Sequence, residues 1–343
     1  MTSSTTSSTT SSTTSSTTST NTSTNTSTNT STNTSIFQNW TEAHSAKFRK
    51  ENFTVNHRLS ETGLFTDQAL ADLLDRHPPH KLDVMTMGSP EGPYPNALRN
   101  GDPRSCSGRF LIEAAKAGRL WINVREAMNL HPEYQELLDR MYGELAERTG
   151  VRRYKARGAI LISSPTTVVP YHCDARDTVL WHIRGQKTFY VYPDRPPYLP
   201  DAGYEAVVLQ ERDEDLPYHP SLEAGATRFE LEADQMVSWV LNSPHRVENQ
   251  SYCVSVTTEF STRASGFKNA VTVTNGLMRR RWGMNPSWYN DAPATKMAKF
   301  VLGRILMKTS LYQHCLRKSY MTFRIDPSQP DSIIEIEPIV RHL

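Results

Sequence analysis

Residues 185–192 have the sequence Gly-Gln-Lys-Thr-Phe-Tyr-Val-Tyr, in which a turn residue precedes a run rich in aromatic and β-branched side chains. This composition is typical of a strand that follows a tight turn. Five further short runs of the same kind, separated by Pro, Gly, Asp and Asn clusters, lie at 159–162, 206–209, 229–231, 236–241 and 252–260. No helix of convincing length separates these runs, so the region predicts an antiparallel sandwich or barrel rather than a parallel sheet.

Helical patterns precede this β region. Thr66-Asp67 stands before an apolar periodic run that stops at Pro78, which predicts a capped amphipathic helix. A second amphipathic run spans Pro132 to Gly150, with the glycine as its stop. Between the two, Met85 to Ser107 is rich in Gly, Pro and Asn and predicts a loop.

After Arg263 the pattern is helical again, over 275–281 and 294–318, and an alternating segment at 333–336 closes the sequence. From Thr2 to Ser35 the chain contains only Ser, Thr and Asn, which predicts disorder because no side chain there gains from burial. The expected organisation is a disordered leader over 1–35, a helical lead-in with an irregular insert over 36–153, a β core over 154–262, and a basic helical region with a terminal strand over 263–343.

Composition, charge and cysteine spacing argue against several classes of protein. The 343 residues carry a net charge of +2, too small for the whole molecule to be attracted to a polyanion. No run approaches 18 apolar residues, and the N-terminus lacks the charged and apolar regions of a secretory signal. The widely spaced cysteines form no CxxC pair, which argues against a zinc ribbon or a disulfide scaffold: Cys106, Cys173, Cys253 and Cys315. We therefore expect a soluble cytoplasmic protein with reduced thiols.

Candidate metal ligands lie inside the β region. His172 and Asp174 are two residues apart, so in an extended segment both side chains project to the same face and can hold one cation. His245, from a distant strand, would complete a set of two imidazoles and one carboxylate, the arrangement that leaves adjacent positions open on non-haem Fe(II). Catalytic zinc uses similar residue types, so the ligands alone leave the metal open.

Lys187 lies 15 residues after His172, at the start of the aromatic strand. An ammonium there could hold the far carboxylate of a 2-oxo diacid whose keto and carboxylate oxygens chelate the metal, and a water-poor pocket would strengthen the ion pair. The spacing therefore points to 2-oxoglutarate as a cosubstrate.

The order HxD, then GxK with its lysine 15 residues after the first histidine, then PHxVxN, resembles the JmjC and cupin-like Fe(II)/2-oxoglutarate oxygenases, a family that includes the asparaginyl hydroxylase of hypoxia-inducible factor. The resemblance covers roughly Tyr154 to Phe260 and implies a double-stranded β-helix (jelly-roll or cupin) core. It implies that the metal is held by the catalytic residues His172, Asp174 and His245.

The same resemblance places Lys187 and Thr178 at cosubstrate-binding positions, although Thr178 stands where the family commonly has Asn, and Val169 stands where it often has a polar residue. The implied activity is a dioxygenase, of hydroxylase type, that uses O2 and 2-oxoglutarate and releases succinate and CO2. Its substrate would be a polypeptide side chain or a small molecule. Two alternatives remain: a non-catalytic cupin-like protein that binds a metal or ligand for regulation, and a metal-dependent cupin enzyme that does not use 2-oxoglutarate.

Other residues in the β region have simpler interpretations. His182 is expected to be structural, and His219 to lie in a loop, where it is the substitute if His245 is not the distal ligand. Asn249 could orient the strand of His245 by hydrogen bonding, and Cys173 is expected to pack in the core on the opposite strand face.

The segment from Arg279 to Lys318 carries nine Lys or Arg residues and one acid, Asp291. An apolar stripe within it predicts a helix docked on the barrel or on a second subunit, as in a homodimer. Binding of nucleic acid is less expected because no nucleic-acid module accompanies the charge, and contact with a membrane surface is the remaining alternative.

Overall fold

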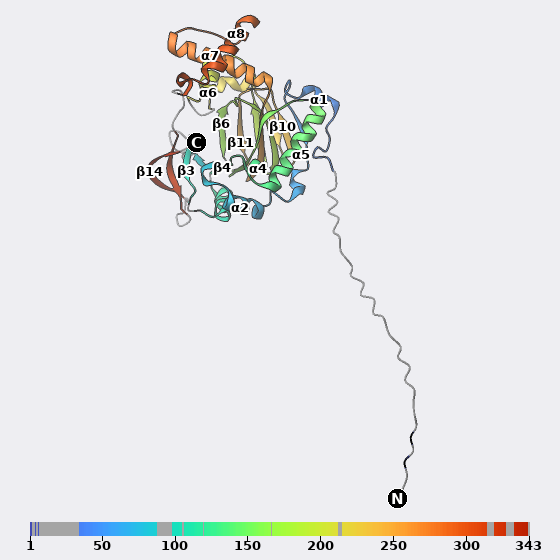
Figure 1. Cartoon of the computed structure of the whole chain (residues 1–343). Helices are drawn as coiled ribbons and strands as arrows, with labels where there is room; N and C mark the ends of the chain where they lie inside the picture. The colour runs from blue at the N-terminus through green and yellow to red at the C-terminus, as the bar shows by residue number, and fades with distance from the viewer. Residues whose placement is uncertain are drawn as a thin grey trace. The chain divides into compact units, whose positions relative to one another are not determined.

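A computed structural model of the chain describes residues 1, 4, 6, 34–87, 98–104, 106–118, 120–165, 167–211, 215–313, 319–326 and 333–341. The predicted disorder of the leader falls almost wholly outside these residues, as does Cys315. The remainder, from Ser35 onward, forms one compact unit of two β-sheets with helices around them (Figure 1).

The larger sheet has ten strands in the order β1-β10-β7-β12-β5-β4-β2-β3-β13-β14. All neighbouring strands pair antiparallel except β13 and β3, which are parallel. The bounds are β1 Phe53–Asn56, β2 Leu82–Met87, β3 Leu98–Asp102, β4 Leu120–Val124, β5 Tyr154–Ser163, β7 Asp177–Arg184, β10 Gln235–Ser238, β12 Cys253–Ser261, β13 Ser319–Ile325 and β14 Ile333–Arg341.

The smaller sheet has four antiparallel strands in the order β6-β11-β8-β9. These are β6 Val168–His172, β8 Lys187–Val191, β9 Thr227–Leu231 and β11 His245–Asn249. A buried cluster joins the two sheets, with side chains from β6, β8, β9 and β11 on one side and from β7 and β10 on the other: Val169, Leu180, Phe189, Val191, Leu231, Val237, Trp239 and Val247. The sheets therefore pack face to face, which excludes water from the space between them.

The helices fall into two groups along the chain. Those of the first half are α1 Glu42–Lys47, α2 Asp67–Arg76, α3 Gly108–Ala117, α4 Ala127–Leu130 and α5 Pro132–Thr149, and those of the second half are α6 Asp201–Val208, α7 Arg263–Trp282, α8 Pro293–Leu306 and α9 Ser310–Gln313. Short 3-10 turns occupy Leu59–Thr62, Pro79–Lys81 and Pro220–Gly225. None of the helices in the described ranges is long and apolar enough to cross a lipid bilayer.

The two helices predicted before the β region are confirmed with their caps. The Thr66 hydroxyl accepts a hydrogen bond from the Ala69 amide at the start of α2. Helix α5 begins at Pro132 and ends at Gly150, which adopts a left-handed conformation with φ of 67°. Sheets with flanking helices are thus present as expected.

Two sequence-based expectations are wrong. Residues 206–209 are not a strand, because Val207 and Val208 pack with Tyr204 into one buried cluster as part of α6. The predicted loop from Met85 to Ser107 contains the end of β2 and all of β3. These strands are short and extend the edge of a sheet built mostly by later residues, so their stability comes from partners that are distant in sequence.

Candidate metal and cosubstrate site

The histidine at the end of β6 reaches the space between the sheets through a β-bulge. On β11 His245 and Val247 are two positions apart, but their partners on β6, His172 and Val169, are three positions apart. The extra residue on β6 shifts the alternation of faces by one position, so His172 lies on the same face as Val169, which belongs to the cluster between the sheets. Tyr171 instead joins the separate cluster formed with α6 and α7.

The structure brings the three predicted ligands together. One donor atom each from His172, Asp174 and His245 lies within 4.8 Å of the other two. His245 Nε2 is 3.8 Å from Asp174 Oδ2, and the two imidazole rings have centroids 4.0 Å apart. Among the described residues, no other group of three or more His, Cys, Asp or Glu side chains is close enough to share an ion.

Hydrogen bonds orient both imidazoles for metal binding. His172 Nδ1 lies 2.7 Å from the Pro170 carbonyl, and His245 Nδ1 lies 3.1 Å from the Ser243 carbonyl. A carbonyl only accepts, so each Nδ1 carries the proton and each neutral ring presents the lone pair of Nε2. This is the usual outer contact of a histidine that binds a metal.

The carboxylate of Asp174 also fits a cation. Its Oδ2 is buried with no hydrogen-bond partner, an arrangement that costs free energy unless something else satisfies the atom. Burial raises the pKa of Asp174, while the nearby His172 ring and the Thr178 hydroxyl oppose that rise. Burial, followed by the proximity of His172, holds the pKa of His245 well below its usual value, so its ring stays neutral.

Two asparagines fix the loop that carries Asp174. Asn242 Nδ2 donates to the Asp174 carbonyl at 2.7 Å, and Asn269 Nδ2, from α7, donates to the Ala175 carbonyl at the same distance. Asn242 itself has a φ of 65°, a conformation that Asn tolerates better than most residues. The loop is therefore held from both sides at the ends of the sheets.

Lys187 is a buried cation without an acidic partner. Its side chain is 4% exposed, its Nζ donates to Ser255 Oγ at 2.9 Å, and no described Asp or Glu forms an ion pair with it. Burial lowers the pKa of Lys187, with a smaller opposing effect from Cys253. A buried lysine normally has a counter-charge, and none of the described residues supplies one by an ion pair to Lys187.

The strand register links Lys187 to the predicted metal ligands. Val191 on β8 lies opposite His245, and Lys187 lies opposite Asn249. Lys187, Phe189 and Val191 share one face of β8, and the Phe189 ring stacks on His245 at 5.3 Å. Lys187 is four residues from Val191, the residue opposite His245. At the usual rise of a strand, the backbone of Lys187 therefore lies about 13 Å along β8 from that of Val191.

Sequence reasoning missed polar groups on β4 and β12. Asn123, Leu161 and Ser255 stand in one row across three neighbouring strands. Trp121 Nε1 and Asn123 Oδ1 are buried with no hydrogen-bond partner among the described residues, and so is Asn249 Oδ1. No sequence signal marks Trp121 or Asn123, because β4 lies in the stretch predicted to be helical.

The remaining polar candidates have structural roles. His182 is fully buried between Ser255 Oγ and the Gly185 carbonyl, and burial lowers its pKa to about 3. His219 accepts from the Ser221 amide and caps a 3-10 turn, outside the group of ligands. Asn249 hydrogen-bonds the Thr167 carbonyl, and Cys173 is fully buried in the cluster with α6 and α7, as expected for both.

Among known proteins, similarity to this chain is found with solved structures. No protein-family model matches the chain, and no curated protein sequence matches it. The X-ray structure of YcfD from E. coli is similar, with a TM-score of 0.47 and 16% identity over 87% of this chain and 78% of that one. YcfD described as a ribosomal oxygenase from Escherichia coli, in complex with cobalt and 2-oxoglutarate, gives a TM-score of 0.46 and 16% identity over 87% and 77%. These structures are of a ribosomal oxygenase rather than of the asparaginyl hydroxylase, and a similarity of this size does not show what this chain does.

Proposed function

We propose that the chain is an Fe(II)- and 2-oxoglutarate-dependent oxygenase of the JmjC and cupin-like type, with a double-stranded β-helix formed by β5 to β12. The observation that carries the proposal is a three-residue ligand group at the face between the two sheets and, on the pair β8 and β11, a buried lysine that has no ion pair with any described acid. The strand orders β10-β7-β12-β5 and β6-β11-β8-β9 support the double-stranded β-helix.

The metal would be held by Nε2 of His172, Nε2 of His245 and the Asp174 carboxylate. Two imidazoles and a carboxylate with no fourth ligand among the described residues suit ferrous iron with open positions better than structural zinc, which prefers four protein ligands. Bound there, Fe(II) supplies the activation of O2 and the oxidative decarboxylation of 2-oxoglutarate. The chain itself orients the imidazoles through Pro170 and Ser243 and excludes water with Phe189 and Trp239, whose rings lie 5.3 Å and 4.8 Å from that of His245.

The cosubstrate would lie between the metal ligands and Lys187. A five-carbon diacid together with the lysine side chain can span the roughly 13 Å that separate their levels on the strand. The ammonium of Lys187 and the Ser255 hydroxyl would bind the far carboxylate, with neutral His182 holding the serine in place. Trp121 and Asn123, whose buried polar atoms lack partners, would supply the contacts that the family's usual Asn gives at the position of Thr178. Thr178 would instead stabilise the ionised Asp174 carboxylate through its hydroxyl.

The reaction would be a hydroxylation of a polypeptide side chain or a small molecule, coupled to release of succinate and CO2. Full-length protein with Fe(II), O2 and 2-oxoglutarate should form succinate slowly even before its substrate is identified, because the residues that bind metal and cosubstrate are complete. Succinate is measured by mass spectrometry, with Zn(II)-loaded protein as the control that should form none.

The outcomes of that experiment separate the alternatives. Binding of Fe(II) and 2-oxoglutarate without succinate would favour a non-catalytic cupin-like binding protein. Binding of Fe(II) with no affinity for 2-oxoglutarate would contradict the proposal and favour a metal-dependent cupin enzyme of another kind.

A further inference from the structure

Helix α8 packs on α7 through one narrow side. A Cβ at Gly303 would lie 1.9 Å from the Ala270 carbonyl oxygen, so only glycine permits this approach of the two helices. Thr274 Oγ1 donates to the Lys299 carbonyl at 2.8 Å, and Leu306 is buried on the same side. Phe300 contacts Phe267 of α7, with ring centroids 5.2 Å apart, and the opposite side of α8 is exposed.

The outward side of α8 is apolar. Met297, Val301 and Ile305 follow one another at intervals of four residues and are 55%, 53% and 58% exposed. Leu302 beside them is also exposed. We name this set, Met297, Val301, Leu302 and Ile305, the α8 apolar face. No described residue covers it, and contiguous exposed apolar side chains of this kind mark an interaction site.

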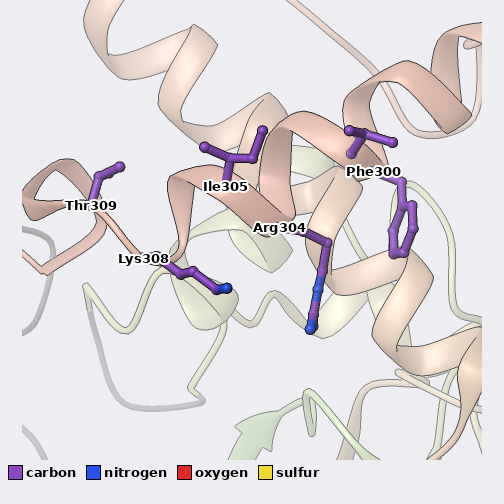
Figure 2. A pocket seen from close by; sticks show the side chains of 6 residues that line it. Phe300, Arg304, Ile305, Lys308 and Thr309 are labelled. Atoms are coloured by element: carbon purple, nitrogen blue, oxygen red, sulfur yellow. The ribbon is translucent and has the colours of Figure 1, made fainter.

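Basic side chains border the α8 apolar face. A shallow groove on the helix is lined by Phe300, Val301, Arg304, Ile305, Lys308 and Thr309. Figure 2 shows Arg304 and Lys308 pointing to the same side of the helix, away from Ile305. Neither cation forms an ion pair with a described residue, and residues 292–313 contain no Asp or Glu. An occupant that covers both the apolar side chains and these cations would be apolar and anionic.

We propose that the α8 apolar face and its basic border dock on an anionic lipid surface. Apolar side chains flanked by Lys and Arg are the pattern of a helix that lies in the membrane interface, where the cations meet lipid headgroups. Pairing α8 with the α8 of a second copy would bury the apolar side chains, but α8 has no acid to pair with Arg304 and Lys308. A nucleic acid would neutralise the cations but leave aliphatic side chains in water.

The test uses full-length protein and sedimentation with vesicles of phosphatidylcholine alone or mixed with phosphatidylserine. The wild type should bind the mixed vesicles and bind the neutral ones only weakly. The double variant Arg304→Glu/Lys308→Glu should bind the mixed vesicles less tightly by roughly fivefold or more for each residue. Val301→Ser/Ile305→Ser should lower binding about tenfold because the inserted apolar area is lost. Arg109→Glu, an exposed arginine on α3, is the matched control and should bind as the wild type does.

All of these side chains are exposed, so the variants should fold, which circular dichroism checks. Absent or equal binding to the two kinds of vesicle would overturn the proposal. A second result would also overturn it. The protein would form a dimer in sedimentation velocity, Val301→Ser/Ile305→Ser would dissociate that dimer, and vesicle binding would be absent. Binding of a single-stranded RNA oligonucleotide that needs Arg304 and Lys308 but not Val301 and Ile305, with no vesicle binding, would assign the surface to nucleic acid instead.

Discussion

Replacing Lys187 with methionine should stabilise the ligand-free protein and at the same time abolish binding of 2-oxoglutarate. The lysine holds a buried ammonium with one hydroxyl partner and no described acidic partner. Methionine keeps most of the length of the side chain and removes the charge, so the free energy of unfolding should rise by about 1 to 3 kcal/mol. The dissociation constant for 2-oxoglutarate should rise at least about 100-fold, because its far carboxylate would be buried without a counter-charge.

Both effects of Lys187→Met can be measured on the same sample, stability by urea unfolding and affinity by calorimetry with Mn(II)-loaded protein. Lys268→Met is the matched control: this second buried lysine has an acidic neighbour, with its Nζ 3.8 Å from Asp194 Oδ2. The control should lose stability and keep its affinity. If Lys187→Met behaves in the same way, Lys187 has a structural role and the cosubstrate site is misplaced.

A smaller change near the far carboxylate of 2-oxoglutarate should weaken its binding to a lesser degree. Trp121→Phe removes the indole N–H, which has no partner in the described part of the chain, together with one ring of the side chain. A lost hydrogen bond to a charged group should weaken 2-oxoglutarate binding about tenfold. Metal affinity should stay unchanged, which separates this group from the metal ligands, whereas the lost packing should lower stability somewhat.

Replacing His245 with alanine should remove the metal. Only His172 and Asp174 would remain, two neighbours on one segment that cannot enclose an ion from the β11 side. We expect the affinity for Fe(II) or Mn(II) to fall by more than the roughly 10 to 100-fold typical of losing an outer hydrogen-bond partner of a ligand. Anaerobic calorimetry measures this, and His219→Ala, which removes an exposed imidazole outside the group, should bind as the wild type does.

His245 packs against the rings of Phe189 and Trp239, so its truncation also removes packing contacts. Asp174→Asn keeps the shape of its side chain and provides a second test, since an amide is a poor replacement for an anionic ligand. Metal affinity that survives in a folded Asp174→Asn variant would remove Asp174 from the site.

The ligand set could be predicted from the sequence because it depends on local spacing. His172 and Asp174 are two residues apart, and a PHxVxN motif marks His245. The β-bulge before His172 could not be predicted, since it is defined by the register with β11, a strand far away in the sequence. Trp121 and Asn123 could not be predicted either, because their importance comes from the row they form with β5 and β12.

Residues 206–209 show the opposite case, in which local composition misleads. Ala-Val-Val-Leu has a high strand propensity, but Pro200 and Asp201 start a helix before it, and the apolar side chains at helical spacing pack against α7. Strand propensity mainly describes packing on a pleated surface, so a helix neighbour overrides it here.

The most direct test of the central claim is the visible spectrum of anaerobic Fe(II)-loaded protein as 2-oxoglutarate is added. If the diacid chelates an iron held by His172, Asp174 and His245 while Lys187 takes its far carboxylate, a weak charge-transfer band should develop and saturate at one equivalent. The Lys187→Met variant should need a concentration at least about 100-fold higher to reach the same band. A wild-type spectrum that does not change at any 2-oxoglutarate concentration, from protein shown to contain iron, would contradict the account.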